Sequence, residues 1–191
     1  HNLGKTPEMI WYKCRSSTRS WKVYHKGLNG GTNPEDYTIN LDQTNSEANN
    51  TNYMTGTAPT STTFVSGNDD DTNGAGYNYI ALLFASANDE EGNPISKVGS
   101  YTGNGTSGLE ITVGFQPRFV IIKNTDDTYS WVTLDTTRGW DSGNNDKLLR
   151  LDLDAAEVTG DYGAPTSTGF TVTSNSSVNT DGHNFIYYAH A

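Results

Sequence analysis

The sequence predicts an all-β fold, arranged as two tandem antiparallel β-sandwich modules of jelly-roll type. Glycine, threonine and asparagine are abundant, with 20 glycines among 191 residues, and only 33% of the residues are hydrophobic. Aromatic residues still make up 11%, whereas disordered chains are poor in them. Short apolar runs alternate with turn residues, and no apolar pattern of helical period is sustained. These features are typical of short strands joined by many turns.

An internal repeat divides the chain into two copies of one module. At a constant offset of 110, Gly4, Pro7, Lys13, Trp21, Leu41, Asp42 and Glu47 recur as Gly114, Pro117, Lys123, Trp131, Leu151, Asp152 and Glu157. Residues 58–64 then recur as residues 164–170, at an offset of 106. We therefore expect modules over residues 1–94 and 95–191, the first truncated at its N-terminus, with a polar linker at residues 88–94.

In both copies, compact apolar runs bounded by turn residues predict the strands. In the first module we expect strands at residues 8–14, 21–25, 37–41, 63–66 and 77–84. In the second we expect them at residues 96–101, 109–113, 118–123, 131–135, 147–151, 170–173 and 184–188. An Ala-Ala-Glu sequence favours one short helix at residues 154–159. Trp21 and Trp131 are expected in the core, because both copies keep them next to apolar positions.

The net charge and the length of the apolar runs argue against nucleic acid and against the membrane interior as partners. Twelve basic and 22 acidic residues give a net charge of −10, which disfavours binding to nucleic acid. Each half of the chain carries the same charge, six basic and eleven acidic residues. No apolar run approaches the roughly 20 residues that cross a bilayer, so we expect no membrane insertion.

Several blocks of the second copy carry a family resemblance. In order, they are Gly99-Ser-Tyr-Thr-Gly-Asn-Gly105, Gly114-Phe-Gln-Pro117, Phe119-Val-Ile-Ile-Lys123, Arg138-Gly139 and Gly169-Phe170. Their order and spacing resemble a repeat found in tail-fibre proteins of bacteriophages, especially marine ones. The first copy has Lys26-Gly27 in place of the Arg-Gly pair and lacks the first block. We interpret the chain as a fragment of a tandem fibre.

The resemblance implies an extracellular virion protein, displayed on a tail fibre as a homotrimer. Its implied role is non-enzymatic adhesion, in which the fibre binds a host-surface glycan or outer-membrane protein. A purely structural role, as a spacer or trimerisation module of the fibre, is the alternative.

Aromatic residues that break the repeat are the predicted ligand-binding residues. Tyr53, Tyr129, Trp140 and Tyr162 lie in polar loops, where a large ring with few rotatable bonds suits recognition of a sugar. Trp140 follows Arg138, which could add a charged contact. The competing interpretation places Trp140 against a neighbouring repeat or subunit.

One acidic run resembles the first half of a calcium-binding loop. Asp69, Asp71 and Asn73 alternate as in a D-x-D-x-N-G sequence, so they are the candidate ligands for Ca²⁺. The bidentate glutamate expected at loop position 12 is replaced by Ile80, and the equivalent run at residues 175–179 has no carboxylate. A solvated hairpin turn is the favoured interpretation, with calcium as the alternative.

The sequence offers little for catalysis. The four histidines have no paired spacing, and neither a G-x-S-x-G nor an H-E-x-x-H motif occurs. We interpret Asp135 and Arg138 as a structural salt bridge. A glycan depolymerase would need paired acids in a groove, and we interpret Asp152 and Asp154 as solvated instead. No catalytic residue and no further cofactor are predicted.

Overall fold

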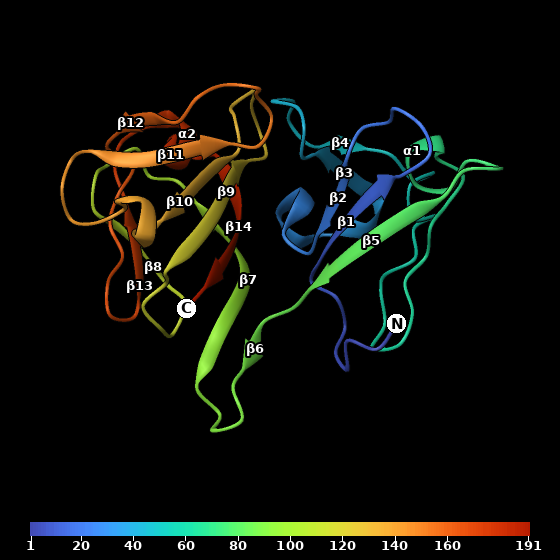
Figure 1. Ribbon diagram of the computed structural model, residues 1–191, viewed down its shortest axis with the longest axis horizontal. Helices are drawn as coiled ribbons and strands as arrows, with labels where there is room; N and C mark the ends of the chain where they lie inside the picture. Colours follow the sequence, from blue (N-terminus) through green and yellow to red (C-terminus); the bar gives the residue numbers. More distant parts are fainter. The chain divides into compact units, whose positions relative to one another are not determined.

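The computed structural model describes residues 1–191, which form two compact units, His1–Ala85 and Ser86–Ala191 (Figure 1). Antiparallel sheets dominate both units, which confirms the predicted all-β sandwich fold. No helix of the structure has the length and apolar character needed to span a membrane.

The first unit is built on one five-stranded antiparallel sheet with the order β4-β3-β2-β1-β5. Its strands are β1 (Met9–Cys14), β2 (Lys22–His25), β3 (Tyr37–Asn40), β4 (Ala48–Asn49) and β5 (Tyr79–Phe84). Its helices are the 3₁₀ turns η1 (Leu28–Gly31) and η2 (Pro34–Asp36) and the short α1 (Asp70–Asn73). β5 is thus an edge strand.

The second unit is a sandwich of a seven-stranded sheet, with the order β12-β11-β10-β9-β14-β7-β6, and the two-stranded sheet β13-β8. Its first strands are β6 (Ala87–Asn88), β7 (Pro94–Thr102), β8 (Leu109–Thr112), β9 (Phe119–Asn124) and β10 (Val132–Asp135). Then follow η3 (Thr136–Arg138), β11 (Asp146–Arg150), β12 (Val158–Gly160), β13 (Gly169–Val172), α2 (Ser176–Asn179) and β14 (Asn184–His190).

Strand register shows that the two units share one arrangement of strands, which we call the frame. In the β1–β5 pair Lys13 lies opposite Ile80, and in the β9–β14 pair Lys123 lies opposite Ile186. These partners are related by the offsets of 110 and 106 that relate the two halves of the sequence. Residues can therefore be compared between the units position by position.

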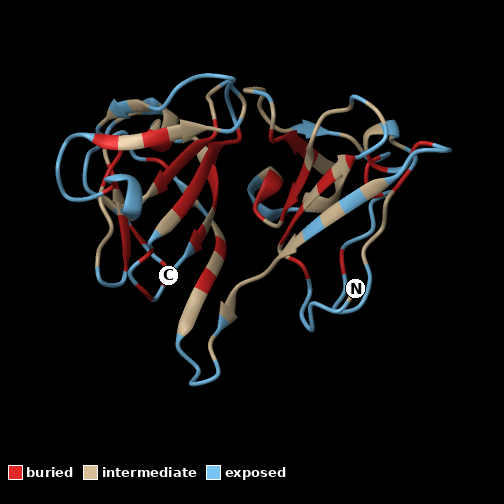
Figure 2. Ribbon diagram, viewed as in Figure 1, coloured by how far each residue is buried: buried red, intermediate tan, exposed pale blue.

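Each unit has its own core on one face of its main sheet (Figure 2). In the second unit, strands β9 and β14 contribute Val120, Ile122, Phe185, Tyr187 and Ala189, which pack with β8 and β13. The predicted core residue Trp131 is 1% exposed, whereas its counterpart Trp21 is only half-buried. The smaller core of the first unit contains Ile10, Tyr12, Tyr24, Tyr53 and Met54.

The polar stretch predicted as a linker is instead the turn of a hairpin in the second unit. β6 pairs with β7 around it, and the backbone N–H of Asp89 donates to the carbonyl of Asn93 at 2.8 Å. The Asp89 side chain accepts from the backbone N–H of Asn93 at 2.7 Å, and the hydrogen bonds from Asn93 lower the pKa of the Asp89 carboxyl. The division between the units therefore lies ahead of this turn, after Ala85, and not at residue 94.

Two other predicted elements are wrong. Residues 63–66 form no strand, although their equivalents in the second unit form β13 and pair with β8. Of the positions equivalent to β8, His1 and Asn2 lie within residues 1–191, and the amino group of His1 donates to the carbonyl of Thr62 at 2.8 Å without forming a strand. The predicted helix at residues 154–159 is an extended segment that ends in β12, because Val158 pairs with Leu148 of β11.

Candidate functional site

Three of the four predicted ligand-binding aromatics are core residues, so their interpretation as exposed stacking surfaces is wrong. Trp140 is 1% exposed, Tyr53 0% and Tyr162 7%. The Trp140 ring packs edge-on against Phe170 with centroids 6.3 Å apart, and its Nε1 donates to the carbonyl of Gly163 at 2.8 Å. The loop that carries it folds back over the core of its own unit.

Tyr53 and Tyr162 also lie in loops that pack against the core of their own unit. The Tyr53 ring meets Tyr12 edge-on at 5.2 Å between centroids, and the Tyr53 carbonyl accepts from the N–H of Gly67 at 2.8 Å. The backbone N–H of Tyr162 donates to the buried carboxylate of Asp146 at 2.7 Å. Polar loop sequence therefore does not mark these rings as exposed.

The remaining two candidates are more accessible but have structural partners. Tyr129 is half-buried, and its carbonyl accepts from Lys123 Nζ at 2.7 Å. Arg138 is exposed and pairs with Glu157. The interpretation of Arg138 and Asp135 as a salt bridge is wrong, because the Asp135 carboxylate lies 3.7 Å from the guanidinium of Arg118.

The acidic run forms the capped start of a short helix, not a hairpin turn. Asp69 Oδ1 accepts from the N–H of Asp71 at 2.8 Å, as an N-cap residue does. The Asp71 carboxylate pairs with Lys22 at 3.4 Å, and Asn73 donates to the carbonyl of Gly67 at 2.9 Å. No three side chains among His, Cys, Asp and Glu gather to hold a metal. The three predicted ligands thus have protein partners.

This capping role predicts a specific mutational pattern. Asp69→Ala should lower the free energy of unfolding by about 1 kcal/mol, the usual loss for an N-cap, in a urea titration. Asp69→Asn should be nearly neutral, because Asn175 caps α2 in the equivalent position. If Asp69 instead bound calcium, added Ca²⁺ would raise the melting temperature and Asp69→Asn would abolish that rise.

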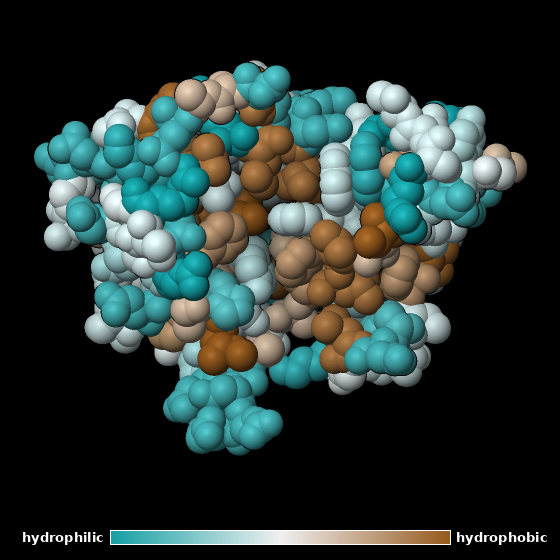
Figure 3. Space-filling model, viewed as in Figure 1, coloured by the Kyte–Doolittle hydropathy of each residue, from teal (hydrophilic) through white to brown (hydrophobic).

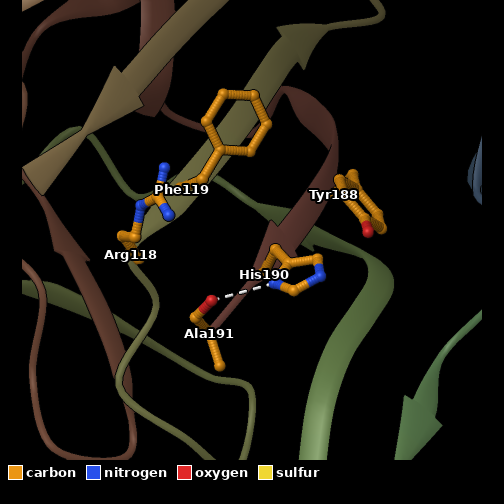
Figure 4. A pocket seen from close by; sticks show the side chains of 5 residues that line it. All are labelled: Arg118, Phe119, Tyr188, His190 and Ala191. Atoms are coloured by element: carbon orange, nitrogen blue, oxygen red, sulfur yellow. Dashed lines mark hydrogen bonds between the residues drawn. The ribbon is translucent and has the colours of Figure 1, made fainter. Parts of the chain in front are cut away.

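A surface pocket of the second unit brings together a cation and three rings (Figure 4). Its volume is about 340 Å³, and it is lined by Arg118, Phe119, Tyr188, His190 and Ala191. Phe119 lies at the start of β9, while Tyr188 and His190 lie near the end of the neighbouring strand β14. The rings of Tyr188 and His190 meet edge-on with centroids 6.3 Å apart.

Strand alternation explains why these residues share one face. Phe119 lies directly opposite His190 in the antiparallel β9–β14 pair, so the two side chains point to the same side of the sheet. Tyr188 precedes His190 by two positions and follows them there. The intervening residues Tyr187 and Ala189 belong to the core. The pocket therefore lies on the face of the sheet opposite the core.

The polar groups of the pocket have partners within the second unit. The side chain of Arg118 is 62% exposed and its guanidinium is steadied at 3.7 Å by Asp135. Arg118 also borders a second pocket of about 260 Å³, with Gln116, Pro117 and Thr136. Burial raises the pKa of the Tyr188 phenol, while a side-chain hydrogen bond with Ser96 acts in the opposite direction.

The first unit has a different surface at the equivalent positions. Glu8 replaces Arg118, Leu82 replaces Tyr188, and Phe84 replaces His190. Glu8 pairs with Lys26 at 2.6 Å; Lys26 lies one position past the equivalent of Asp135, so an ion pair of reversed sign joins the same end of the hairpin. The aromatic and cationic pocket is specific to the second unit.

Comparison with known families covers both units together. The model of the family described as "Domain of unknown function (DUF7483)" matches residues 1–191. The chain belongs to this family. No curated protein and no solved structure matches it.

The pocket of this DUF7483 chain was missed by reasoning that considered only loop aromatics. Its residues lie at strand ends, on the face of the sheet opposite the main core cluster. The usable signal was the difference between the copies at these positions, where Leu82 and Phe84 give way to Tyr188 and His190.

Proposed function

We propose that this DUF7483 chain is a non-enzymatic adhesion segment of a phage tail fibre that binds an acidic host-surface glycan. The observation that carries the proposal is the pocket of Arg118, Phe119, Tyr188 and His190. Trp, Tyr, Phe and His rings offer flat apolar faces to a sugar ring, and a guanidinium matches the two oxygens of a carboxylate. The volume of the pocket, about 340 Å³, leaves room for a sugar residue.

The net charge of −10 makes the position of this cation important. An anionic glycan is repelled by most of the acidic surface, so a local guanidinium directs it to one place. Because Arg118 is well exposed, binding should weaken as salt increases.

The fibre context is supported by the tandem repeat and by the resemblance of the second copy to tail-fibre repeats. A single exposed site of this kind binds weakly. Several copies on a homotrimeric fibre would gain avidity without any new contact. The spacer interpretation differs in predicting no binding by the isolated chain.

The experiment is a glycan array probed with the 191-residue chain, followed by titration of the best ligand. Arg118→Ala should weaken binding to an acidic glycan about tenfold or more, because a hydrogen bond to a charged group contributes roughly 1.5–3 kcal/mol. Arg15→Ala removes an exposed cation from a loop of the first unit and serves as the matched control.

A second variant tests the rings while preserving the fold. Tyr188→Leu with His190→Phe installs the residues that the first unit carries at the same register, so we expect the sheet to form as before. Binding should fall together with that of Arg118→Ala. Binding that is unaffected by both variants would remove the pocket from the function, and absence of binding to any glycan would favour the spacer.

A further inference from the structure

Arg118 borders two pockets of the second unit. One is the pocket of about 340 Å³ that contains the rings of β9 and β14, and we call it the aromatic pocket. The other, which we call the polar pocket, has a volume of about 260 Å³ and is lined by Gln116, Pro117, Arg118 and Thr136. A side chain that borders both pockets can contact a ligand that occupies both.

The backbone of Arg118 fixes the order of the two pockets across the sheet. Its N–H donates to the carbonyl of His190 at 2.8 Å, and its carbonyl accepts from the N–H of Thr136 at 2.9 Å. The strand that follows, β9, pairs with β14 on one side and with β10 on the other. Neighbouring strands are about 4.8 Å apart, so the backbones at His190 and Thr136 are separated by roughly 10 Å. That span exceeds the width of one sugar ring.

The polar pocket offers hydrogen-bonding groups that the protein leaves unused. The amide of Gln116 and the hydroxyl of Thr136 each donate and accept hydrogen bonds. Neither group bonds to another part of the protein, and Gln116 is exposed. Because the hydroxyl groups of a sugar also donate and accept, this pair suits a neutral sugar residue.

The charges around Arg118 favour one acidic group on the ligand and disfavour a second. The Asp135 carboxylate, which directly precedes Thr136, lies 3.7 Å from the guanidinium. Its other oxygen accepts from the N–H of Thr137 at 2.7 Å, which holds the carboxylate in place. A carboxylate in the polar pocket would therefore meet a like charge.

The first unit carries different groups at the equivalent positions. Glu8 and Lys26, which replace the arginine and the threonine, pair at 2.6 Å, so both charges have a partner within the protein. Apolar side chains gather over β5 (Figure 3), where Leu82 and Phe84 replace the two rings of β14. The combination of an exposed cation, rings and unused polar groups is therefore specific to the second unit.

We propose that the two pockets form one site for a disaccharide unit in which a uronic acid is joined to a neutral sugar. The ring of the acid lies against the aromatic side chains, and its carboxylate binds the guanidinium of Arg118. The neutral residue occupies the polar pocket and bonds to Gln116 and Thr136. This inference rests on the proposed glycan binding and adds the pair of residues that is recognised.

The probes are methyl glucuronide, a disaccharide of glucuronic acid and glucose, and a disaccharide of two glucuronic acids, each titrated into the 191-residue chain by NMR. The mixed disaccharide should bind about tenfold more tightly than methyl glucuronide, the order expected for two added hydrogen bonds. The doubly acidic disaccharide should gain nothing, because its second carboxylate meets Asp135. Gln116→Thr combined with Thr136→Val should remove the tenfold gain and leave binding of methyl glucuronide unchanged.

The double variant is expected to fold, because the first unit carries threonine at the place of Gln116 and valine has nearly the shape of threonine. Thr137→Val is the matched control, since Thr137 is the next residue of η3, is exposed and lies outside the polar pocket. It should bind all three probes as the original chain does.

The outcomes separate this inference from the proposed function. Equal affinity for methyl glucuronide and the mixed disaccharide, a gain that survives the double variant, or tightest binding of the doubly acidic disaccharide would each overturn the two-pocket site alone. Failure of every probe to bind would also overturn it, while the glycan array decides the wider proposal. Binding that is unaffected by Arg118→Ala would contradict both.

Discussion

Replacement of Trp140 by alanine should destabilise the second unit by about 3–5 kcal/mol, the usual loss for a fully buried aromatic ring. The ring is 1% exposed, packs against Phe170, and donates from Nε1 to the carbonyl of Gly163. The variant leaves a cavity and removes the donor for that carbonyl. Urea denaturation measures the total loss, and amide hydrogen exchange assigns it to Ser86–Ala191.

Two controls separate the ring from its loop. Trp140→Phe keeps most of the ring volume and loses only the hydrogen bond, so a smaller loss is expected. Tyr129→Ala truncates a half-buried aromatic of another loop and should cost less than Trp140→Ala. An unchanged unfolding midpoint for Trp140→Ala would show that the ring is exposed in solution, and would restore it as a ligand-binding candidate.

Alkaline solution should unfold the first unit, because its buried tyrosines ionise more readily in the unfolded chain. Burial raises the pKa of Tyr12 and Tyr53 well above 10, and that of Tyr24 to about 12. Above about pH 10 these tyrosines ionise in the unfolded chain but stay protonated in the folded unit, so the unfolded state binds fewer protons and stability falls as pH rises. Three such groups cost about 4 kcal/mol by pH 11, at about 1.4 kcal/mol per group and pH unit. Circular dichroism and tyrosinate absorbance should change together.

Tyr53→Phe tests the cause of this transition. The Tyr53 hydroxyl is buried and has no hydrogen-bond partner, so its removal should leave stability at neutral pH unchanged or slightly higher. The alkaline midpoint should move upward. Tyr77→Phe, at a tyrosine that is 40% exposed, should leave it in place. Equal shifts for both variants would contradict the explanation by burial.

The repeat allowed much of the fold to be predicted from sequence. Equal offsets imply equal register, and the pairs Lys13–Ile80 and Lys123–Ile186 follow the two offsets found in the sequence. Trp131, retained in both copies next to apolar residues, is buried as expected. Residues that recur in both copies indicate the strands and core positions that the two units have in common.

The loops could not be predicted in the same way. Trp140 is held by a carbonyl 23 residues away, a contact that local composition does not reveal. The polar residues around it are used in turns, as when Asp141 accepts from the N–H of Gly143 at 2.6 Å. The interpretation of Asp69 as a calcium ligand had a related cause, since N-caps and calcium-binding loops both use short acidic side chains before a turn.

The reversed ion pair constrains how such repeats can recombine. A genetic crossover that joined the first unit to the second between the equivalents of residues 8 and 25 would place Glu8 beside Asp135, and the reciprocal product would place Arg118 beside Lys26. Both products carry like charges where each parent has an attraction. Crossovers elsewhere in the frame leave the pair intact. Shuffling should therefore move the β1–β2 hairpin between repeats as one inherited block, together with the charge that it presents to a ligand.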